Sequence, residues 1–364
     1  MPKEQVKTVK PNVDQVIAEI NKAMKKDVVG RASDMAPIHR WPSGVLPFDH
    51  LADGGLAAGR FTEIYGPFSS LKSFIALKLV AETQRRGGVA AYVDSEHAFD
   101  EPWAIEQGVN VDELLVQRPE TGEEALTVME ALIRGGYDLI VWDSIAATQP
   151  KQYAEKAPGD DNQPAGLARM MSAGLRRLNT ANSKTAVLAI NQTRTNIGMT
   201  FGSKMSVPGG NAMPFYASVR MNFIKAGRVN EDVMIWTGDK LESAKSTVQH
   251  KMKIVVDKSK LSAPHREVWF NYDLRTGQVD ELSYMIGWAV EQGIIQIGNA
   301  GLYTWDNDWK IRGKDKFFAA IAEETELIEW MRKTMMAEVV SESDSHTSPS
   351  KQGKSKAASQ KSKS

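Results

Sequence analysis

The sequence of 364 residues contains no cysteine. This excludes a disulfide framework and a thiolate metal site, and is typical of a protein in a reducing cytoplasm. The sequence also lacks an apolar run long enough to span a bilayer and lacks an N-terminal signal-peptide region, so we expect a cytoplasmic protein with no membrane partner. Its 45 basic residues equal its 45 acidic residues, so any contact with nucleic acid must come from local patches rather than from overall charge.

The chain is long enough for one large core and a smaller domain. Between Arg60 and about Leu274, helical patterns alternate with apolar runs at 90–94, 138–143, 186–191 and 218–224. This alternation predicts an α/β fold with a mostly parallel twisted sheet flanked by helices. We expect four regions: an N-terminal helix and oligomerisation linker (1–40), the α/β core (41–270), a small α+β domain (271–338) and a disordered Lys- and Ser-rich tail (339–364).

One segment of the core has the pattern of a phosphate-binding loop. An apolar strand from Phe61 leads into this loop, and an amphipathic helix follows it. Backbone N–H groups of such a loop point at the phosphates, the lysine neutralises the outer phosphates, and the final hydroxyl binds Mg²⁺. We therefore expect ATP and Mg²⁺ as cofactors, with the cofactor-binding residues Gly66, Pro67, Phe68, Ser69, Ser70, Leu71, Lys72 and Ser73.

Leu71 departs from this pattern, because a phosphate-binding loop has glycine where the backbone approaches the phosphate. An ordinary Ser-rich turn before a core helix is the alternative interpretation of this segment.

Two apolar runs end in carboxylates that extend the predicted site. Asp143 closes the run 139–142, where it is placed to hold Mg²⁺ together with Ser73. Glu96 follows the run that ends at Asp94, and is placed to orient or deprotonate an attacking water. Taken singly, each carboxylate is more often a capping residue than a catalytic one.

The segment 192–211 contains no acidic residue and is rich in glycine, serine and threonine. It is too long for an ordinary connection, which indicates a function or disorder. Its cations, backbone N–H groups and two apolar side chains suit phosphate contact and insertion between bases, whereas a mobile surface loop is the alternative. Its candidate DNA-binding residues are Arg194, Met199, Phe201, Lys204, Gly209, Gly210 and Asn211. Arg169, Ser172 and Arg176 are further candidates, spaced to share one helical face.

Several stretches together resemble the RecA family of recombinases. The resemblance covers about 44–264 and is carried by Gly59-Arg-Phe-Thr-Glu-Ile-Tyr-Gly-Pro, Val93-Asp-Ser-Glu-His-Ala-Phe-Asp, Val141-Trp-Asp-Ser-Ile-Ala-Ala, Ile190-Asn-Gln-Thr-Arg and Gly209-Gly-Asn-Ala-Met-Pro-Phe-Tyr-Ala-Ser-Val-Arg. It implies a RecA-like ATPase core and an ATP-dependent helical filament that pairs single-stranded DNA with a homologous duplex. It also implies a single-strand-binding protein and loading factors as further partners.

The resemblance assigns roles to individual residues. It implies that Lys72 binds phosphate, that Glu96 is the general base and that Gln192 senses the γ-phosphate. Asp100 and Trp103 match the positions that hold the adenine. The alternative for Gln192 is a residue that ends a strand and bonds to the backbone, and the alternative for Trp103 is a buried core tryptophan. Lys258 and Lys260 match a lysine pair that reaches the ATP of a neighbouring subunit, although Lys-x-Lys at a strand edge is usually only a solvated face.

The segment 153–164 matches the position of the first DNA loop of the family, but its two aspartates make it less basic than a DNA contact would be.

Bulky residues at position 71 occur in phage relatives of the family, which favours a viral origin. Two other functions remain open: a ring-forming motor such as a replicative helicase, and a DNA-coating protein that binds ATP but hydrolyses it poorly.

Overall fold

The computed structural model describes residues 12–154, 164–195, 205–305 and 309–345. The chain separates into two units, Met1–His39 and Arg40–Ser364. The first unit holds helix α1 (Val13–Met24), as the helical spacing predicts, and a short 3-10 helix, Ala32–Asp34. The Asn12 side chain begins α1 by accepting hydrogen bonds from the backbone N–H groups of residues 14 and 15. Within this unit, the apolar face of α1 is exposed.

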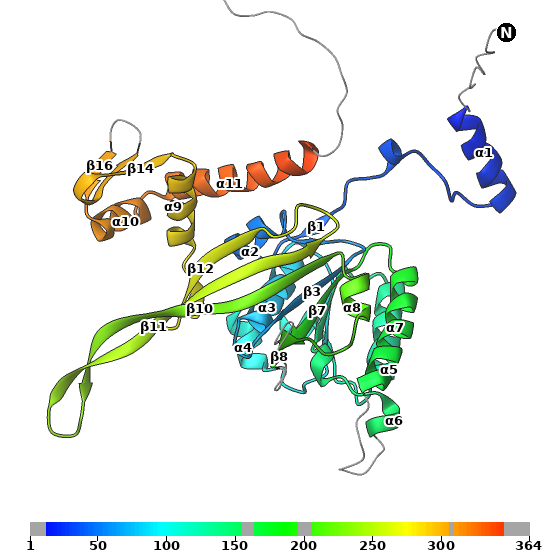
Figure 1. The fold of residues 1–364 in the computed structure, drawn as a ribbon, viewed down its shortest axis with the longest axis horizontal. Coiled ribbons are helices and arrows are strands. Elements are labelled where there is room, and N and C mark those ends of the chain that lie inside the picture. Colours follow the sequence, from blue (N-terminus) through cyan, green and yellow to red (C-terminus); the bar gives the residue numbers. More distant parts are fainter. Residues whose placement is uncertain (1–11, 155–163, 196–204, 306–308, 346–364) are drawn as a thin grey trace, which may run out of the picture. The chain divides into compact units, whose positions relative to one another are not determined.

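The second unit is built on a central sheet of nine described strands in the order β13-β12-β11-β10-β3-β7-β6-β4-β5. The six strands from β10 to β5 in this order are parallel to one another. Their bounds are β3 (Phe61–Gly66), β4 (Ala90–Asp94), β5 (Leu115–Gln117), β6 (Leu139–Asp143), β7 (Ala186–Gln192) and β10 (Val219–Trp236). The predicted α/β class with a mostly parallel sheet is thereby confirmed (Figure 1).

Helices cover both faces of this sheet (Figure 1). Alternate residues of each central strand face opposite cores, because side chains of a strand alternate in direction. On β6, Leu139 and Val141 pack in the core with α3, whereas Ile140 and Trp142 pack in the core with α5 and α7. The helices of the unit before residue 220 are α2 (Leu46–Leu51), α3 (Lys72–Arg85), α4 (Glu101–Glu106), α5 (Gly122–Arg134), α6 (Lys151–Ala154), α7 (Pro164–Ala181) and α8 (Ala212–Tyr216).

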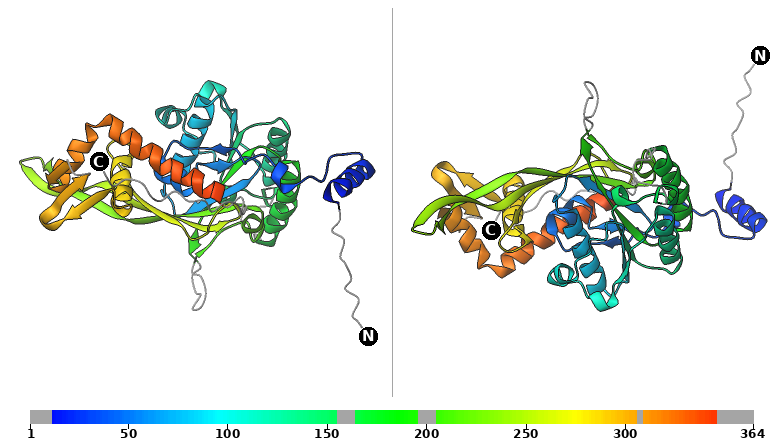
Figure 2. Two further views of the ribbon diagram at one scale, coloured as in Figure 1. Left: turned by 90° about the horizontal axis from the view of Figure 1, so that it is seen from above. Right: turned by 90° about the horizontal axis from the view of Figure 1, so that it is seen from below.

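The sheet changes direction at its other end. β11 (Leu241–Ser259), β12 (Glu267–Asp273) and β13 (Gln278–Val279) are antiparallel to their neighbours, so the expectation of parallel strands up to about residue 274 is wrong for this part. β10 and β11 form a long hairpin that projects from the core as a twisted ribbon (Figures 1 and 2). The strands of a solvated ribbon lack the continuous apolar run of a buried parallel strand. For this reason the last apolar run that the sequence shows in this region ends at residue 224, although the strand continues.

The last part of the second unit has its own core. It contains a three-stranded antiparallel sheet, β14 (Ile295–Gly298), β15 (Leu302–Trp305) and β16 (Trp309–Arg312), with α9 (Glu281–Glu291), α10 (Lys314–Ala322) and α11 (Thr325–Ser345). This agrees with a small α+β region. Its proposed boundary at 270 falls within β12, and α11 continues past the proposed start of the tail at 339. The rest of that tail lies outside the described residues.

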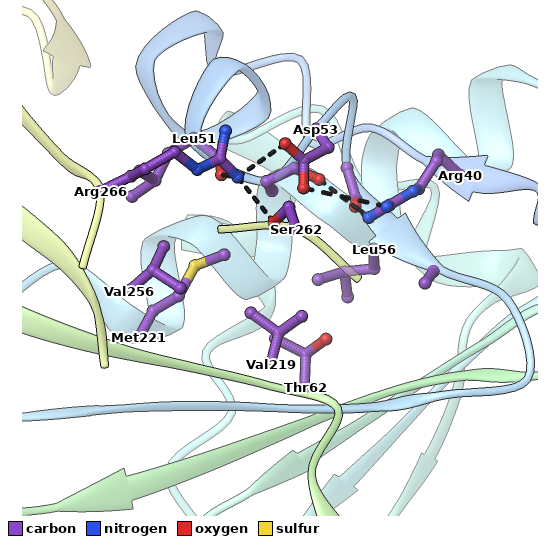
Figure 3. A pocket seen from close by; sticks show the side chains of 13 residues that line it. Arg40, Leu51, Asp53, Leu56, Thr62, Val219, Met221, Val256, Ser262 and Arg266 are labelled. Atoms are coloured by element: carbon purple, nitrogen blue, oxygen red, sulfur yellow. Dashed lines mark hydrogen bonds and ion pairs between the residues drawn. The ribbon is translucent and has the colours of Figure 1, made fainter. Parts of the chain in front are cut away.

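A small cavity of about 10 Å³ lies between α2 and the sheet, and the residues around it have a structural role (Figure 3). Arg266 donates to the Asp53 carboxylate at 2.6 Å and to the Leu51 carbonyl at 3.0 Å, and Arg40 lies 3.9 Å from the same carboxylate. The cavity holds at most about one water. The contacts of Arg266 therefore join the end of α2 to the turn before β12, and the cavity is not a ligand site.

Candidate nucleotide and DNA site

The predicted phosphate loop connects β3 to α3 as the sequence indicated. Gly66 ends β3 beside the backbone of Phe223, and a Cβ at this glycine would lie 2.2 Å from the Phe223 carbonyl oxygen. No other residue fits there. Lys72 begins α3, and its Nζ donates to the Pro67 carbonyl at 2.7 Å and to Ser70 Oγ at 3.2 Å. Burial lowers the pKa of Lys72 to about 8, and the negative charges of Asp143 and Glu96 oppose this shift.

Leu71 occupies the position before α3 in the left-handed region, with φ 68° and ψ 15°. This conformation costs a leucine roughly 1–2 kcal/mol and costs glycine nothing in steric strain. The side chain packs against the core on the α3 side of the sheet, which offsets part of that cost. The loop thus keeps the backbone shape that glycine would give, with a different side chain.

The two predicted metal ligands lie together. Ser73 Oγ donates to Asp143 Oδ2 at 2.9 Å, and the Tyr92 hydroxyl donates to the same oxygen at 2.6 Å. Burial raises the pKa of Asp143, and these two hydrogen bonds oppose the shift. Hydroxyl and carboxylate oxygens suit Mg²⁺, which usually takes its other ligands from phosphates and water. Among the described residues, no group of three His, Asp or Glu side chains could hold a metal ion by itself.

Glu96 and Gln192 come together from the ends of different strands. Gln192 Nε2 donates to Glu96 Oε1 at 2.6 Å, and Ser144 Oγ donates to the same oxygen at 2.5 Å. Within the described residues, the side-chain amide of Gln192 therefore bonds a carboxylate. A carboxylate and an amide at the carboxyl edge of the sheet are the groups that orient and deprotonate a water.

A cavity of about 300 Å³ extends from the phosphate loop. Residues 69–73 line one end, while Phe74, Trp103, His250, Met252, Tyr272 and Leu274 line the rest. Trp103 is half-buried and partly packed on the core, so it offers one side to the cavity. Asp100 caps α4 by accepting from Trp103 N at 2.8 Å, and its exposed carboxylate retains a second oxygen. Tyr272, whose ring is edge-on to Phe74 at 5.3 Å, was not identified from the sequence.

Several of the DNA candidates lie on α7 or beside it. Arg169, Ser172 and Arg176 are exposed on this helix. A Cβ at Gly210 would lie 2.9 Å from Cβ of Ala168, so the end of the predicted DNA loop passes close to the same helix. Gly209 is buried beside it, whereas Asn211 and Arg194 are exposed. Met199, Phe201 and Lys204, and residues 155–163 of the predicted first DNA loop, lie outside the described residues.

The lysine pair does not lie with the phosphate loop of its own chain. Lys258 Nζ donates to the carbonyls of Pro214 at 2.5 Å and Ala217 at 2.9 Å, at the end of α8. Lys260 Nζ donates to the Phe215 carbonyl at 3.3 Å. Burial, and then the charge of Lys260, lower the pKa of Lys258. Both ammonium groups therefore lie just after the predicted DNA loop.

A buried ion pair that the sequence pattern did not predict links these parts. Glu63 is fully buried in β3, and its carboxylate accepts from Arg220 Nε at 2.5 Å and from Asn191 Nδ2 at 3.0 Å. The Asn191 amide also donates to the Pro208 carbonyl at 3.0 Å. Glu63 and Asn191 precede the phosphate loop and Gln192 respectively, so the network ties both to the end of the DNA loop. A glutamate inside a buried strand was the only signal for it in the sequence.

The RecA N-terminal domain family matches residues 11–278. The chain belongs to the RecA family. It is 38% identical over 334 residues to Protein RecA of Thermus thermophilus, covering 89% of this chain and 93% of the relative. It is 37% identical over 333 residues to Protein RecA of Deinococcus radiodurans, covering 90% and 88%, and 39% identical over 310 residues to that of Frankia alni, covering 83% and 85%.

This RecA-family protein is therefore a recombinase and a DNA-dependent ATPase, as the sequence motifs indicated. Nucleotide binding, DNA binding and assembly into filaments are properties of its family. Among the helices that the structure describes, none is long and apolar enough to cross a membrane.

Proposed function

We propose that this protein binds Mg·ATP at the phosphate loop and couples its hydrolysis to pairing of single-stranded DNA with a homologous duplex in a helical filament. The main support for this proposal is the hydrogen bond from the Gln192 amide to the Glu96 carboxylate. It lies where the carboxyl edge of the sheet meets the start of the DNA loop. A terminal phosphate that competes for the amide of Gln192 would alter the backbone that leads into that loop.

The residues in and around the phosphate loop have separate tasks in this proposal. Lys72 neutralises the outer phosphates, Ser73 and Asp143 hold the Mg²⁺, and Glu96 takes a proton from the attacking water. The metal, when bound, supplies charge neutralisation at the phosphates. Trp103 and Tyr272 provide aromatic faces for the adenine, and Asp100 provides an acceptor for its exocyclic amine.

DNA binds, in this proposal, along the exposed face of α7 and the segment 194–211. Arg169 and Arg176 contact phosphates together with Ser172, Arg194 and Lys204, while backbone N–H groups of residues 209–211 add uncharged contacts. Met199 and Phe201 separate bases. Basic phosphate contacts make such binding depend on salt.

Assembly completes the site. The exposed apolar face of α1, with the linker to residue 40, docks on a neighbouring copy and generates an open head-to-tail helix. Lys258 and Lys260 then reach the ATP of the neighbour, where a cation stabilises the charge that develops in phosphoryl transfer. A cytoplasmic location, and partners such as a single-strand-binding protein and loading factors, remain predictions from the sequence.

Two assays test this function. Electron microscopy of the protein with ATP and single-stranded DNA should show long helical filaments; discrete closed rings would instead support a ring-forming motor. Phosphate release should rise when single-stranded DNA is added. Equal, negligible release with and without DNA, in a protein that still binds ATP, would support the DNA-coating alternative.

A further inference from the structure

Strand β11 has an irregularity beside the lysine pair. Arg220 on β10 is paired with Lys258 on β11, and the next residue of β10, Met221, is paired with Val256. Asp257 lies between these two pairs. It is therefore the extra residue of a β-bulge, in which two residues of one strand oppose a single residue of the other.

This bulge decides which side of the sheet the lysines reach. Side chains alternate between the two faces of a strand, and Met252, Ile254 and Val256 are buried in the core with α3. Without an extra residue, the same alternation would point Lys258 into that core. Lys258 instead bonds carbonyls at the end of α8, which packs on the opposite face of the sheet. The bulge thus turns Lys258, and with it Lys260, toward the α8 side.

The carboxylate of the bulged residue is held by the strand that leads into the phosphate loop. The hydroxyl of Tyr65, which precedes Gly66, donates a hydrogen bond to Asp257. Because β10 lies between β3 and β11, the Tyr65 side chain reaches across β10, where the guanidinium carbon of Arg220 lies 4.8 Å from the ring centre. Arg220 is fixed in turn by the buried Glu63. Burial, and then the bond to Asp257, raise the pKa of Tyr65, so its hydroxyl keeps the proton that it donates.

We propose that the hydrogen bond from Tyr65 to Asp257 holds this bulge and thereby positions Lys258 and Lys260 for the ATP of a neighbouring copy. Tyr65 and Asp257 are positioning residues that act through the lysines. This inference rests on the proposed role of the lysine pair and names the contact that orients it. A displacement of about 1 Å in a group that acts on the reaction can cost about 10²-fold in rate.

Steady-state ATP hydrolysis by the full-length protein on single-stranded DNA tests the inference. Tyr65→Phe keeps the ring and removes the hydroxyl, so it should lower kcat by about 10- to 100-fold and change KM for ATP by no more than about twofold. Asp257→Ala should do the same. Asp257→Asn, whose side-chain oxygen still accepts the bond, should keep most of kcat. The matched control is Tyr303→Phe, which removes a hydroxyl from β15 and should behave like the unaltered protein.

Mixed filaments show on which copy the bond acts. Tyr65→Phe subunits diluted in an excess of Glu96→Gln subunits would have neighbours whose lysines are held correctly. Their kcat per subunit should therefore rise to that of unaltered subunits in the same excess, and Lys258→Ala subunits should be rescued in the same way. A loss that the excess does not rescue would mean that Tyr65 acts on the phosphate loop of its own copy, and would overturn the inference.

Two further outcomes separate this inference from the function on which it rests. Full activity of Tyr65→Phe alongside a large loss in Lys258→Ala would overturn the positioning role of Tyr65 and leave the lysine pair in place. Full activity of Lys258→Ala would instead overturn the proposed role of the lysine pair, and this inference with it.

Discussion

The two ends of the nucleotide cavity are built in different ways. The phosphate end comes from one continuous segment, 66–73, and from strand ends that meet at the carboxyl edge of the parallel sheet. The base end comes from side chains far apart in the sequence, such as Trp103 and Tyr272, on a short helix and an antiparallel strand. The phosphate end contains charges and hydrogen bonds that hold catalytic groups, whereas the base end is mostly apolar surface. Chemistry should therefore depend on the first, and affinity for the base on the second.

The largest effect should follow loss of the lysine at the phosphate end. Lys72→Ala removes the ammonium that neutralises the outer phosphates, and we expect DNA-dependent ATPase activity to fall by about 10³-fold or more. Nucleotide-dependent DNA binding should be lost with it. Arg85→Ala, at the exposed end of the same helix, is the control and should behave like the unaltered protein. Unchanged strand exchange by Lys72→Ala with ATP would refute the site.

Glu96→Gln should separate chemistry from binding. The amide keeps the size of the side chain but cannot take a proton, so we expect kcat to fall by about 10²- to 10⁴-fold. The dissociation constant for ATP should change little, which equilibrium binding would show. Glu101→Gln, at the exposed start of α4, serves as the control. A loss of binding as large as the loss of kcat would mean that Glu96 holds the site together rather than acting on water.

At the base end, Trp103→Ala should have the opposite profile. Loss of the aromatic face should weaken binding of ATP and ADP by about tenfold, because aromatic contacts add roughly 0.5–1.5 kcal/mol to the burial of area. Activity at saturating ATP should change by no more than about threefold. Trp103→Phe should keep most of the affinity. If Trp103→Ala instead lowers kcat with unchanged affinity, the contrast between the two ends is wrong.

The smallest effect concerns Leu71. In Leu71→Gly, relief of the left-handed strain and loss of the packed side chain oppose each other, so we expect the free energy of unfolding to change by no more than about 1 kcal/mol. Leu71→Val should destabilise by roughly 1–2 kcal/mol, because a β-branched residue tolerates positive φ poorly. Denaturant titration measures both. Phosphate release by Leu71→Gly with single-stranded DNA then shows whether leucine slows turnover.

The sequence predicted the phosphate end better than the base end, for a physical reason. Residues 66–73 act through their own backbone, so a local pattern is enough to place them. Tyr272 and His250 reach the cavity through the register of antiparallel strands, which includes bulges near residues 220, 225 and 229. A single bulge reverses which side chains face the core, and no local pattern reports it. The link from Glu63 through Asn191 to Pro208 likewise depends on contacts between two strands and the segment before α8.

Coupling between the nucleotide and the DNA loop is the central claim, and DNA affinity in different nucleotide states tests it most directly. Fluorescence anisotropy of a labelled single-stranded oligonucleotide would be measured at fixed salt without nucleotide, with ADP and with a slowly hydrolysed ATP analogue. Through the Gln192–Glu96 contact, we expect the analogue to tighten DNA binding well beyond the other two states. Equal affinity in all three states would contradict the account.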